Sequence, residues 1–338
     1  MFHRYLGRFT LLALAFIAGA RADVDTVSMS SPALAALETA RTGTEGRTAL
    51  VHYQLLGDKL VRRQDATLRH VYGEAPRGDV SFDGAQNYVV VRQEPSVGTA
   101  SLLSIESGRT SIWAQDVYPG SRPMSGVGSG VYVTRGLPGE HNTALTLSYF
   151  DIGGIRRDVF SDHALLLHLI ANDQDTLIAY RVRETDASLL RIRLKDGALV
   201  QETPIQGFAR DFSWDGAHVL LSNHSAKEDN LWQVQSWSPE SGALRVLFSA
   251  PDESPIPFAA TQGAVWTQRE QAKPGEVGPI DVYTDESADG MWMTVTRSDD
   301  NSSDALSLVT SDHRRAWRID PDDVHVESMG FVGGRTLR

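Results

Sequence analysis

The sequence lacks cysteine altogether, and it has fewer basic than acidic side chains. The absence of cysteine excludes disulfides, thiolate zinc sites, iron–sulfur clusters and a cysteine nucleophile. The 32 lysine and arginine residues stand against 43 aspartate and glutamate residues, which gives a formal net charge of −11. An acidic chain is poorly suited to binding nucleic acid or anionic lipid, so we expect neither as a partner.

Long apolar runs are also missing. A helix that crosses a membrane needs about 20 apolar residues, whereas residues 11–20 supply ten and the run at residues 164–171 is interrupted by His168. We therefore expect no membrane span. The 338 residues, with 41% hydrophobic and 22% charged side chains, are typical of a globular protein.

The first 22 residues have the pattern of a secretory signal peptide. Arg4 and Arg8 precede the short apolar run, and the segment ends in Ala20-Arg21-Ala22. We predict cleavage before Asp23. Removing three arginines would change the formal net charge from −11 to −14. We therefore expect the protein to be periplasmic or secreted. Secreted eukaryotic proteins of this size usually contain disulfides, so the lack of cysteine favours a Gram-negative periplasm.

Residues 23–47 form an N-terminal segment, for which the pattern predicts one short helix at residues 31–41. Ser31 is suited to cap this helix, Pro32 suits its first turn, and Leu34 and Leu37 are three residues apart. From residue 48 onward, runs rich in Val, Leu, Ile, Tyr and Trp alternate with turn residues. These runs predict an all-β domain over residues 48–338.

A four-strand module recurs along this domain. Asp-Gly turns at Asp83-Gly84 and Asp215-Gly216 are 132 residues apart, three times 44, and each is followed by a Ser-Gly turn, at Ser107-Gly108 and Ser241-Gly242. Two weaker copies lie between them. A period of about 44 residues with four strands per unit predicts a β-propeller. The candidate strands fit six or seven four-stranded blades, with seven the better fit.

The motif DFSWDGAHVLLSNHS, followed by NLWQVQSWSPESGALRVLF, resembles the propeller repeats of TolB-like periplasmic proteins. The resemblance is good over residues 209–248, fair over residues 79–114 and faint elsewhere. It implies a periplasmic propeller that docks proteins. TolB itself has an α/β domain before its propeller, whereas here only about 50 residues precede the first clear strand, so the resemblance is to the repeats and not to TolB itself.

The two ends of the sequence complement each other. The C-terminal VHVESMGFVGGRTLR supplies the first strands of a unit, and LVHYQLL, KLVRRQ and TLRHVY near the N-terminus supply the strands that such a unit lacks. We expect N- and C-terminal strands to pair and to close the propeller without free sheet edges.

Catalytic and metal motifs are scarce. Neither G-x-S-x-G nor H-E-x-x-H occurs. The glycines at residues 126–130 lack the ending of a phosphate loop and open a strand, so we interpret them as a turn. His163 and His168 are five residues apart, a spacing that places them on opposite faces of a strand. We therefore predict no catalytic, cofactor or metal residues, apart from the calcium alternative below.

An acidic loop and two tryptophans are candidates for ligand binding. Residues 299–304 form an acidic loop that resembles the start of a calcium site, but Asp304 and Thr310 replace the glycine and glutamate of an EF-hand. Calcium therefore stays an alternative to a solvated loop. Among the seven tryptophans, Trp237 and Trp317 lie near turns and are the candidates for ligand contact; most of the others match core positions of the repeat.

Three functions follow as hypotheses. The first is an exported, non-catalytic propeller that acts as a scaffold for a protein or a cell-envelope component. The second is a propeller enzyme, a hydrolase or lyase acting on a sugar or peptide in the central funnel, because propellers recruit site residues from several blades. The third is a small-ligand or glycan-binding module.

Overall fold

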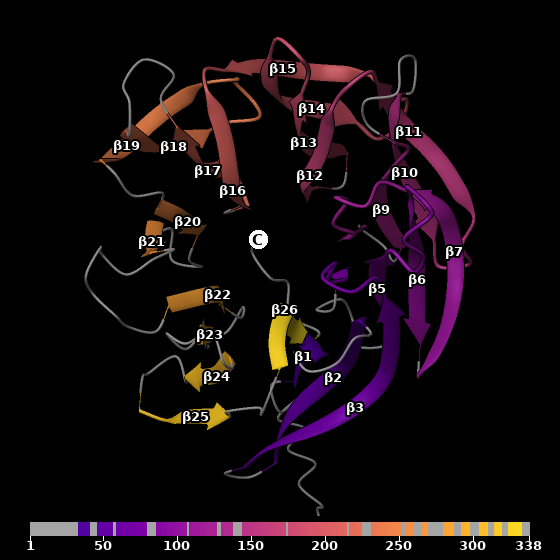
Figure 1. The fold of residues 1–338 in the computed structure, drawn as a ribbon. Coiled ribbons are helices and arrows are strands. Elements are labelled where there is room, and N and C mark those ends of the chain that lie inside the picture. The colour runs from indigo at the N-terminus through magenta and orange to yellow at the C-terminus, as the bar shows by residue number, and fades with distance from the viewer. Residues whose placement is uncertain are drawn as a thin grey trace, which may run out of the picture. The chain divides into compact units, whose positions relative to one another are not determined.

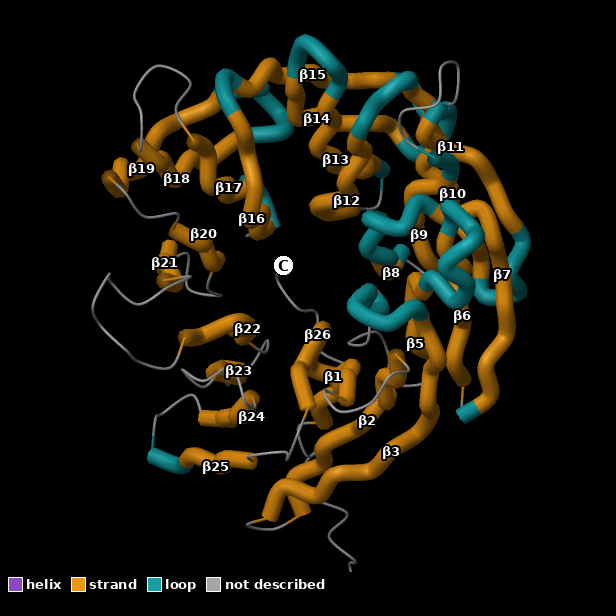
Figure 2. The backbone as a smooth tube through the Cα atoms, in the orientation of Figure 1, coloured by secondary structure: helices purple, strands orange, loops and turns teal. Residues whose placement is uncertain are grey.

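The structure is a computed structural model that describes residues 33–40, 46–56, 59–79, 86–106, 108–126, 130–137, 144–173, 175–214, 216–224, 231–251, 255–259, 265–269, 280–286, 292–297, 304–309, 314–319 and 324–332. These residues contain strands, turns and loops and no helix (Figure 2). The strands within each described sheet run antiparallel wherever they pair. The prediction of an all-β protein is confirmed.

Sheet A joins the two ends of the chain. Its order is β26-β1-β2-β3, with bounds Val324–Val332, Ala33–Ala40, Gly46–Leu56 and Lys59–His70. Because β1 pairs with both β2 and β26, the C-terminal strand completes a sheet that the N-terminal strands begin. The predicted pairing of N- and C-terminal strands is confirmed.

Sheet B contains two consecutive groups of four strands. The first group is β4 (Arg77–Asp79), β5 (Gln86–Val91), β6 (Ala100–Glu106) and β7 (Arg109–Val117). The second group is β8 (Met124–Ser125), β9 (Gly130–Arg135), β10 (Leu145–Asp151) and β11 (Arg156–Asp162). A single residue pair, Val117 with Arg135, links the two groups.

Sheets C and D each come from one continuous stretch of chain. Sheet C consists of β12 (Leu166–Asn172), β13 (Thr176–Val182), β14 (Ala187–Arg193) and β15 (Leu199–Ile205), which lie side by side in Figure 1. Sheet D consists of β16 (Phe208–Trp214), β17 (Val219–His224), β18 (Leu231–Trp237) and β19 (Leu244–Pro251).

The C-terminal third forms two further sheets. Sheet E pairs β20 (Pro255–Ala259) with β21 (Val265–Arg269). Sheet F contains β22 (Ile280–Glu286), β23 (Trp292–Arg297), β24 (Asp304–Val309) and β25 (Ala316–Ile319). Sheet E has two strands among the described residues, so the choice between six and seven blades stays a prediction.

The core lies between neighbouring sheets, and alternate residues of one strand serve two different interfaces. In β1, Leu34 and Ala36 pack with Leu306 of sheet F, whereas Ala35 and Leu37 pack against sheet B. Successive side chains of a strand point to opposite faces. A strand covered on both faces is therefore mostly apolar, as β5 is over Tyr88–Val91, and its two polar residues, Gln86 and Asn87, are buried as well.

Contacts between sheets follow the order of the chain and then close. Strands of sheet A contact sheet B, and the same holds for B with C, C with D, D with E, and E with F. The last sheet then contacts the first, through β22 and β24 against β26 and through β25 against β3. This closure leaves the apolar faces of sheet A covered on both sides.

The expected glycine turns occur where the structure describes them. Gly108 and Gly242, the glycines of the two Ser-Gly turns, have φ values of 77° and 71°. Residues with a side chain rarely adopt this left-handed conformation, so glycine is required at these hairpins. Asp83-Gly84 and the predicted signal peptide at residues 1–22 lie outside the described residues.

One prediction is wrong: residues 33–40 are strand β1 and not a helix. Alanine favours helices in isolation, but β1 lies between β26 and β2 and buries Leu34, Ala35, Ala36 and Leu37 completely. Burial on two faces and pairing on two edges outweigh that preference. Strand pairing therefore starts at Ala33, ahead of residue 48. One strand, β3, contains KLVRRQ and the first four residues of TLRHVY.

Candidate functional site

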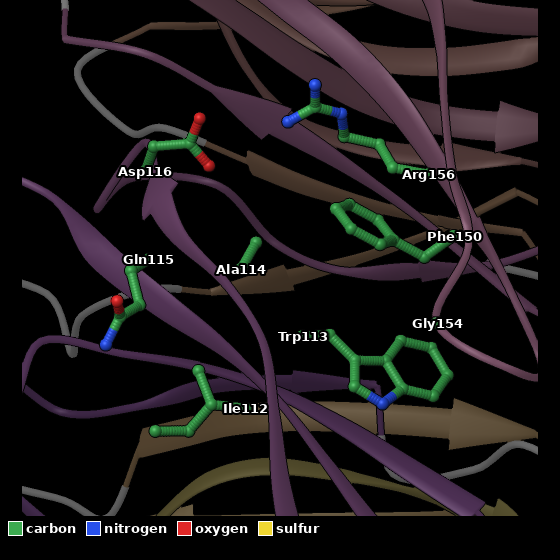
Figure 3. Close-up of a pocket in the computed structure, with 8 residues that line it drawn as sticks. All are labelled: Ile112, Trp113, Ala114, Gln115, Asp116, Phe150, Gly154 and Arg156. Carbon is green, nitrogen blue, oxygen red and sulfur yellow. The ribbon is translucent and has the colours of Figure 1, made fainter.

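An open surface hollow of about 540 Å³ lies between β7 and the turn that joins β10 to β11. Figure 3 shows the residues that line it, which are Ile112, Trp113, Ala114, Gln115, Asp116, Phe150, Gly154 and Arg156. The two elements come from the two halves of sheet B. The hollow therefore depends on how these halves meet.

Trp113 provides the aromatic part of the hollow. Its ring centroid is 5.4 Å from that of Tyr88 and 6.4 Å from that of Phe150, with a near-parallel angle of 29° to the phenylalanine. Gly154 has a φ of 78°, and a Cβ at this position would lie 3.3 Å from the Trp113 indole. Glycine thus allows the turn to approach the indole closely, and the half-buried ring is held from two sides.

The facing turn is held by a single aspartate. Asp151 Oδ1 accepts hydrogen bonds from the backbone N–H groups of Gly153 (2.9 Å) and Ile155 (2.8 Å), and the Asp151 carbonyl accepts one from Gly154 (2.9 Å). Aspartate side chains commonly stabilise tight turns in this way. The turn is therefore ordered by its own hydrogen bonds.

Three exposed isoleucines lie on the two elements that form the hollow, and one of them, Ile112, lines it. Ile112 is 52% exposed on β7, and Ile152 and Ile155 are 63% and 71% exposed in the turn that carries Gly154. We call these three residues the isoleucine rim. Single exposed apolar residues are common, but several beside one hollow are typical of a surface that binds another molecule.

The opposite side of the hollow is polar and its charges are paired. Arg135 Nε donates to Asp116 (2.9 Å), and Arg135 Nη1 donates to Asp158 (3.0 Å). The hydrogen bond from Arg135 lowers the pKa of Asp116. Arg156 lies 3.5 Å from Asp158. The polar side thus offers hydrogen-bonding groups without a large unpaired charge.

The two tryptophans selected from the sequence lie in different sheets. Trp237 is fully buried between sheets C and D, and its indole N–H donates to Thr203 Oγ1 (2.9 Å), so it offers no ring face to an external ligand. Trp317 is half-buried against the core between sheets A and F. Its role in ligand contact stays a prediction.

Sequence reasoning missed Trp113, the tryptophan that does line a hollow. Its position after the Ser107-Gly108 turn matched the repeat, which favoured a core role. The available signal was Gly153-Gly154, about 40 residues further along the chain. Only the strand pairing shows that this turn faces Trp113.

The remaining sequence candidates are placed as follows. The Gly126 N–H donates to the Gly130 carbonyl (2.9 Å), as expected of a turn that opens strand β9. In the acidic loop, residues 299–303 lie outside the described residues. The fully buried Asp304 accepts a hydrogen bond from the backbone of Val326 (2.7 Å) and so joins β24 to β26.

Metal-binding clusters and membrane-spanning helices are both absent from the part of the chain that the structure describes. Within it, no group of three or more histidine, aspartate or glutamate side chains is arranged to hold a metal ion. Within the same residues, no helix has the length and apolar character needed to cross a membrane.

Comparison with known proteins places the fold in one class, the β-propellers. No family model matches the sequence, and no curated protein does. Among solved structures, TolB from Acinetobacter baumannii superposes with a TM-score of 0.52 at 13% identity, over 89% of this chain and 66% of TolB. This chain thus matches slightly less than two thirds of TolB.

Two other propellers superpose similarly. Cobalt-substituted Synechocystis ACO gives a TM-score of 0.54 at 9% identity, over 89% of this chain and 92% of that one. The β-propeller domain of the Trilobed protease from Pyrococcus furiosus gives 0.52 at 9% identity, over 73% and 85%. At these identities the likeness shows the fold alone. The chain is a β-propeller with a TolB-like resemblance, and it is not TolB itself.

Proposed function

We propose that this protein is an exported, non-catalytic β-propeller that binds a protein of the cell envelope through the hollow at Trp113. The observation that carries the proposal is the isoleucine rim beside a fixed aromatic ring. Binding sites on protein surfaces commonly combine a buried aromatic anchor with an apolar surround and a polar edge. The TolB-like fold and the predicted signal peptide support a periplasmic or secreted location.

The occupant that fits this surface is an apolar side chain of a protein partner. Ile112, Ile152 and Ile155 are exposed by half or more, and burying them would contribute free energy in proportion to the apolar area removed from water. Asp116 and Arg135 are already paired, so they need not be neutralised by the partner. The contact would therefore depend little on salt.

Site-specific crosslinking tests this proposal. A photoreactive amino acid at Ile155 should capture a reproducible partner in the periplasm, whereas the same group at Leu199, exposed by 41% on β15, should not. Trp113→Ala should reduce capture at Ile155 by about tenfold or more, because hot-spot aromatics commonly contribute that much. Equal capture at both positions, or capture that is unaffected by Trp113→Ala, would contradict the proposal.

A glycan is the second candidate, because one observation favours it. The Trp113 ring lies beside Gln115, Asp116 and Arg156, which together combine a flat apolar face with hydrogen-bonding groups (Figure 3). A glycan array and tryptophan fluorescence distinguish the two candidates. Saturable sugar binding that Trp113→Ala abolishes, without any captured protein, would replace the protein partner by a glycan.

The enzyme alternative requires several reactive groups in one place. Propeller folds accommodate both binding proteins and enzymes, so the site and not the fold must decide. The hollow at Trp113 contributes one acid, Asp116, and its carboxylate is bound by Arg135. This arrangement favours binding over acid–base chemistry at the hollow.

A further inference from the structure

Sheet E has no room in the sequence for a second hairpin. In each four-stranded group the third and fourth strands form a hairpin, which we call the second hairpin; in sheet C it is β14–β15. Residues 183–207, a stretch of 25 residues, separate β13 from β16 and supply this hairpin. Only the ten residues 270–279 separate β21 from β22. Two strands of seven residues, as in β14 and β15, do not fit there.

Second hairpins contact the preceding group of strands at four places along the chain. The turn of each contains a glycine with φ between 69° and 78°, at Gly108, Gly154, Gly197 and Gly242. Gly108 approaches the Asp65 carbonyl of β3, and Gly154 approaches Trp113 of β7. Gly197 approaches the Val159 carbonyl of β11. The Gly242 carbonyl accepts a hydrogen bond from Thr203 of β15 (3.2 Å). The second hairpin of one group therefore packs on the fourth strand of the group before it.

The strand that precedes sheet E, β19, exposes a run of apolar side chains. Val246, Leu247 and Phe248 are 47%, 37% and 38% exposed. Among the described strands β19 pairs with β18 alone, and Arg245 is its single charged residue. Proteins usually protect such an edge with several charges or cover it with another element. The apolar run is therefore typical of a strand that another element covers.

Phe248 and Arg245 lie on the side of sheet D that faces sheet E. Trp237 of β18 packs against sheet C, and successive side chains of a strand alternate between the two faces. Ser236 and Val234 therefore point the other way, toward β20, which contacts β18. Their cross-strand partners are Arg245 and Phe248, and such partners share a face. A second hairpin of sheet E would cover these two side chains.

We propose that a β-hairpin of a partner protein takes the place of the second hairpin of sheet E. It would pack on Leu247 and Phe248 and add a strand to the edge of β21. Among the described residues β21 pairs with β20 alone, so its other edge presents backbone N–H and C=O groups. Strand addition to such an edge supplies backbone hydrogen bonds, and side chains of the added strand supply the specificity.

Charge selects the kind of hairpin that fits. Strands β19, β20 and β21 contain two arginines, Arg245 and Arg269, and no acidic residue. A hairpin with acidic side chains beside its apolar ones is therefore complementary. A second copy of this chain would bring a formal net charge of −11 against an equal charge, which opposes self-association. The surface contains no residue that lines the hollow at Trp113, so this inference is independent of the proposed function.

Hydrogen exchange of the free full chain tests whether the edge of β21 is open. Strand β17 is paired on both edges, by β16 and β18, and its amides should be protected throughout. In β21 the amides that point away from β20 should exchange at least about tenfold faster than those of β17, because opening is not required for them. Equal protection of both strands would mean that the chain covers this edge itself, which overturns the proposal.

Selection of hairpins on the full chain tests the docking. A phage library of disulfide-closed hairpin peptides is selected against the protein, and the enriched peptides are synthesised. We expect them to be rich in aspartate and glutamate, to bind saturably, and to protect residues 265–269 from exchange. Leu247→Asp should weaken their binding by about tenfold or more. Leu199→Asp changes a similarly exposed leucine on β15 and should leave binding unchanged, as should Trp113→Ala.

The outcomes separate this surface from any other. A selection without a saturable binder overturns the proposal, and so do peptides whose binding is unaffected by Leu247→Asp. Peptides that lose binding with Trp113→Ala instead would support the hollow and contradict the inference for sheet E. If Leu247→Asp fails to fold, Arg245→Glu takes its place, because it should weaken the binding of acidic peptides by about tenfold through repulsion. Unchanged binding to that variant would equally overturn the proposal.

Discussion

Sheets A and C each contain four antiparallel strands, but the strands come from different parts of the chain. Sheet C is assembled from consecutive strands between Leu166 and Ile205, whereas sheet A pairs Val324–Val332 with strands that begin at Ala33. Closing a long loop costs more conformational entropy than closing a short one. The contacts of sheet A therefore hold the whole propeller closed, while those of sheet C hold one blade.

The two sheets also bury charges of opposite sign. In sheet A, Glu38 is 2% exposed and accepts hydrogen bonds from Arg62 (2.6 and 3.1 Å) and from Tyr53. In sheet C, Arg181 is 2% exposed and binds Asp162 of the neighbouring sheet (3.0 Å) and Glu202. The charge of Glu38 is thus compensated within sheet A, whereas the charge of Arg181 is compensated by carboxylates of sheets B and C.

Removing β26 should have the largest effect. A chain that ends at residue 323 loses every pair between β1 and β26 and exposes the apolar surface of Leu34 and Ala36. We expect loss of cooperative unfolding, or a loss on the order of 5 kcal/mol or more, comparable to the whole stability of many domains. Urea denaturation followed by tryptophan fluorescence measures this.

The matched control is a chain that ends at residue 332, which keeps β26. It should unfold like the full chain. An added peptide that corresponds to residues 321–338 should restore cooperative unfolding of the shorter chain by strand addition. If the chain that ends at residue 323 keeps full stability, the closing role of sheet A is wrong.

Removing the buried charge of sheet C should be the next largest effect. Arg181→Met leaves Asp162 and Glu202 without their shared cation, and breaking a buried ion pair costs about 3–5 kcal/mol. Arg183 binds the same Asp162 (2.8 Å) but is 40% exposed. Arg183→Met should therefore cost less than about 1 kcal/mol. Equal losses in chemical denaturation would show that burial does not decide the effect.

Engineered disulfides compare the two sheets directly, and the absence of natural cysteine makes the experiment free of competing pairs. Ala40 pairs with Val324 in sheet A, and Val182 pairs with Ala187 in sheet C. Loop-closure entropy predicts that the first disulfide stabilises the chain by about 3 kcal/mol more than the second. Thermal unfolding of each oxidised variant against its reduced form gives the difference. A larger gain for the pair in sheet C would contradict the comparison.

The sequence predicted correctly those strands and turns whose own residues determine their structure. Apolar runs such as β5 and β13 are buried on both faces, and Gly108 and Gly242 need a conformation that favours glycine. It failed for β1, because an alanine-rich strand looks helical until its two partners are known. It also missed Trp113, since the hollow at this residue depends on register between segments far apart in the sequence.

Acid should weaken sheet C through His168. The pKa of His168 is lowered to about 4 from 6.5, chiefly by burial, so the unfolded chain binds more protons between these values. Stability from this group is full above pH 6.5 and is lost as the pH falls toward 4. The loss at pH 5 is about 2 kcal/mol. His168→Gln should remove this part of the pH dependence, and His163→Gln, which changes an exposed histidine, is the control.

Alkali should weaken sheet A through Tyr53, with the smallest effect. Burial and the charge of Glu38 raise the pKa of Tyr53 above its usual 10. Above pH 10 the unfolded chain therefore loses a proton that the folded chain keeps, and stability falls by about 1 kcal/mol between pH 10 and pH 11. Tyr53→Phe removes this slope, although it also costs the hydrogen bond to Glu38 at every pH. The decisive quantity is the slope between pH 10 and pH 11, measured by denaturant unfolding. If Tyr53→Phe leaves the slope unchanged, alkali destabilises the protein through another group. The expected contrast, in which acid weakens sheet C and alkali weakens sheet A, would then be wrong.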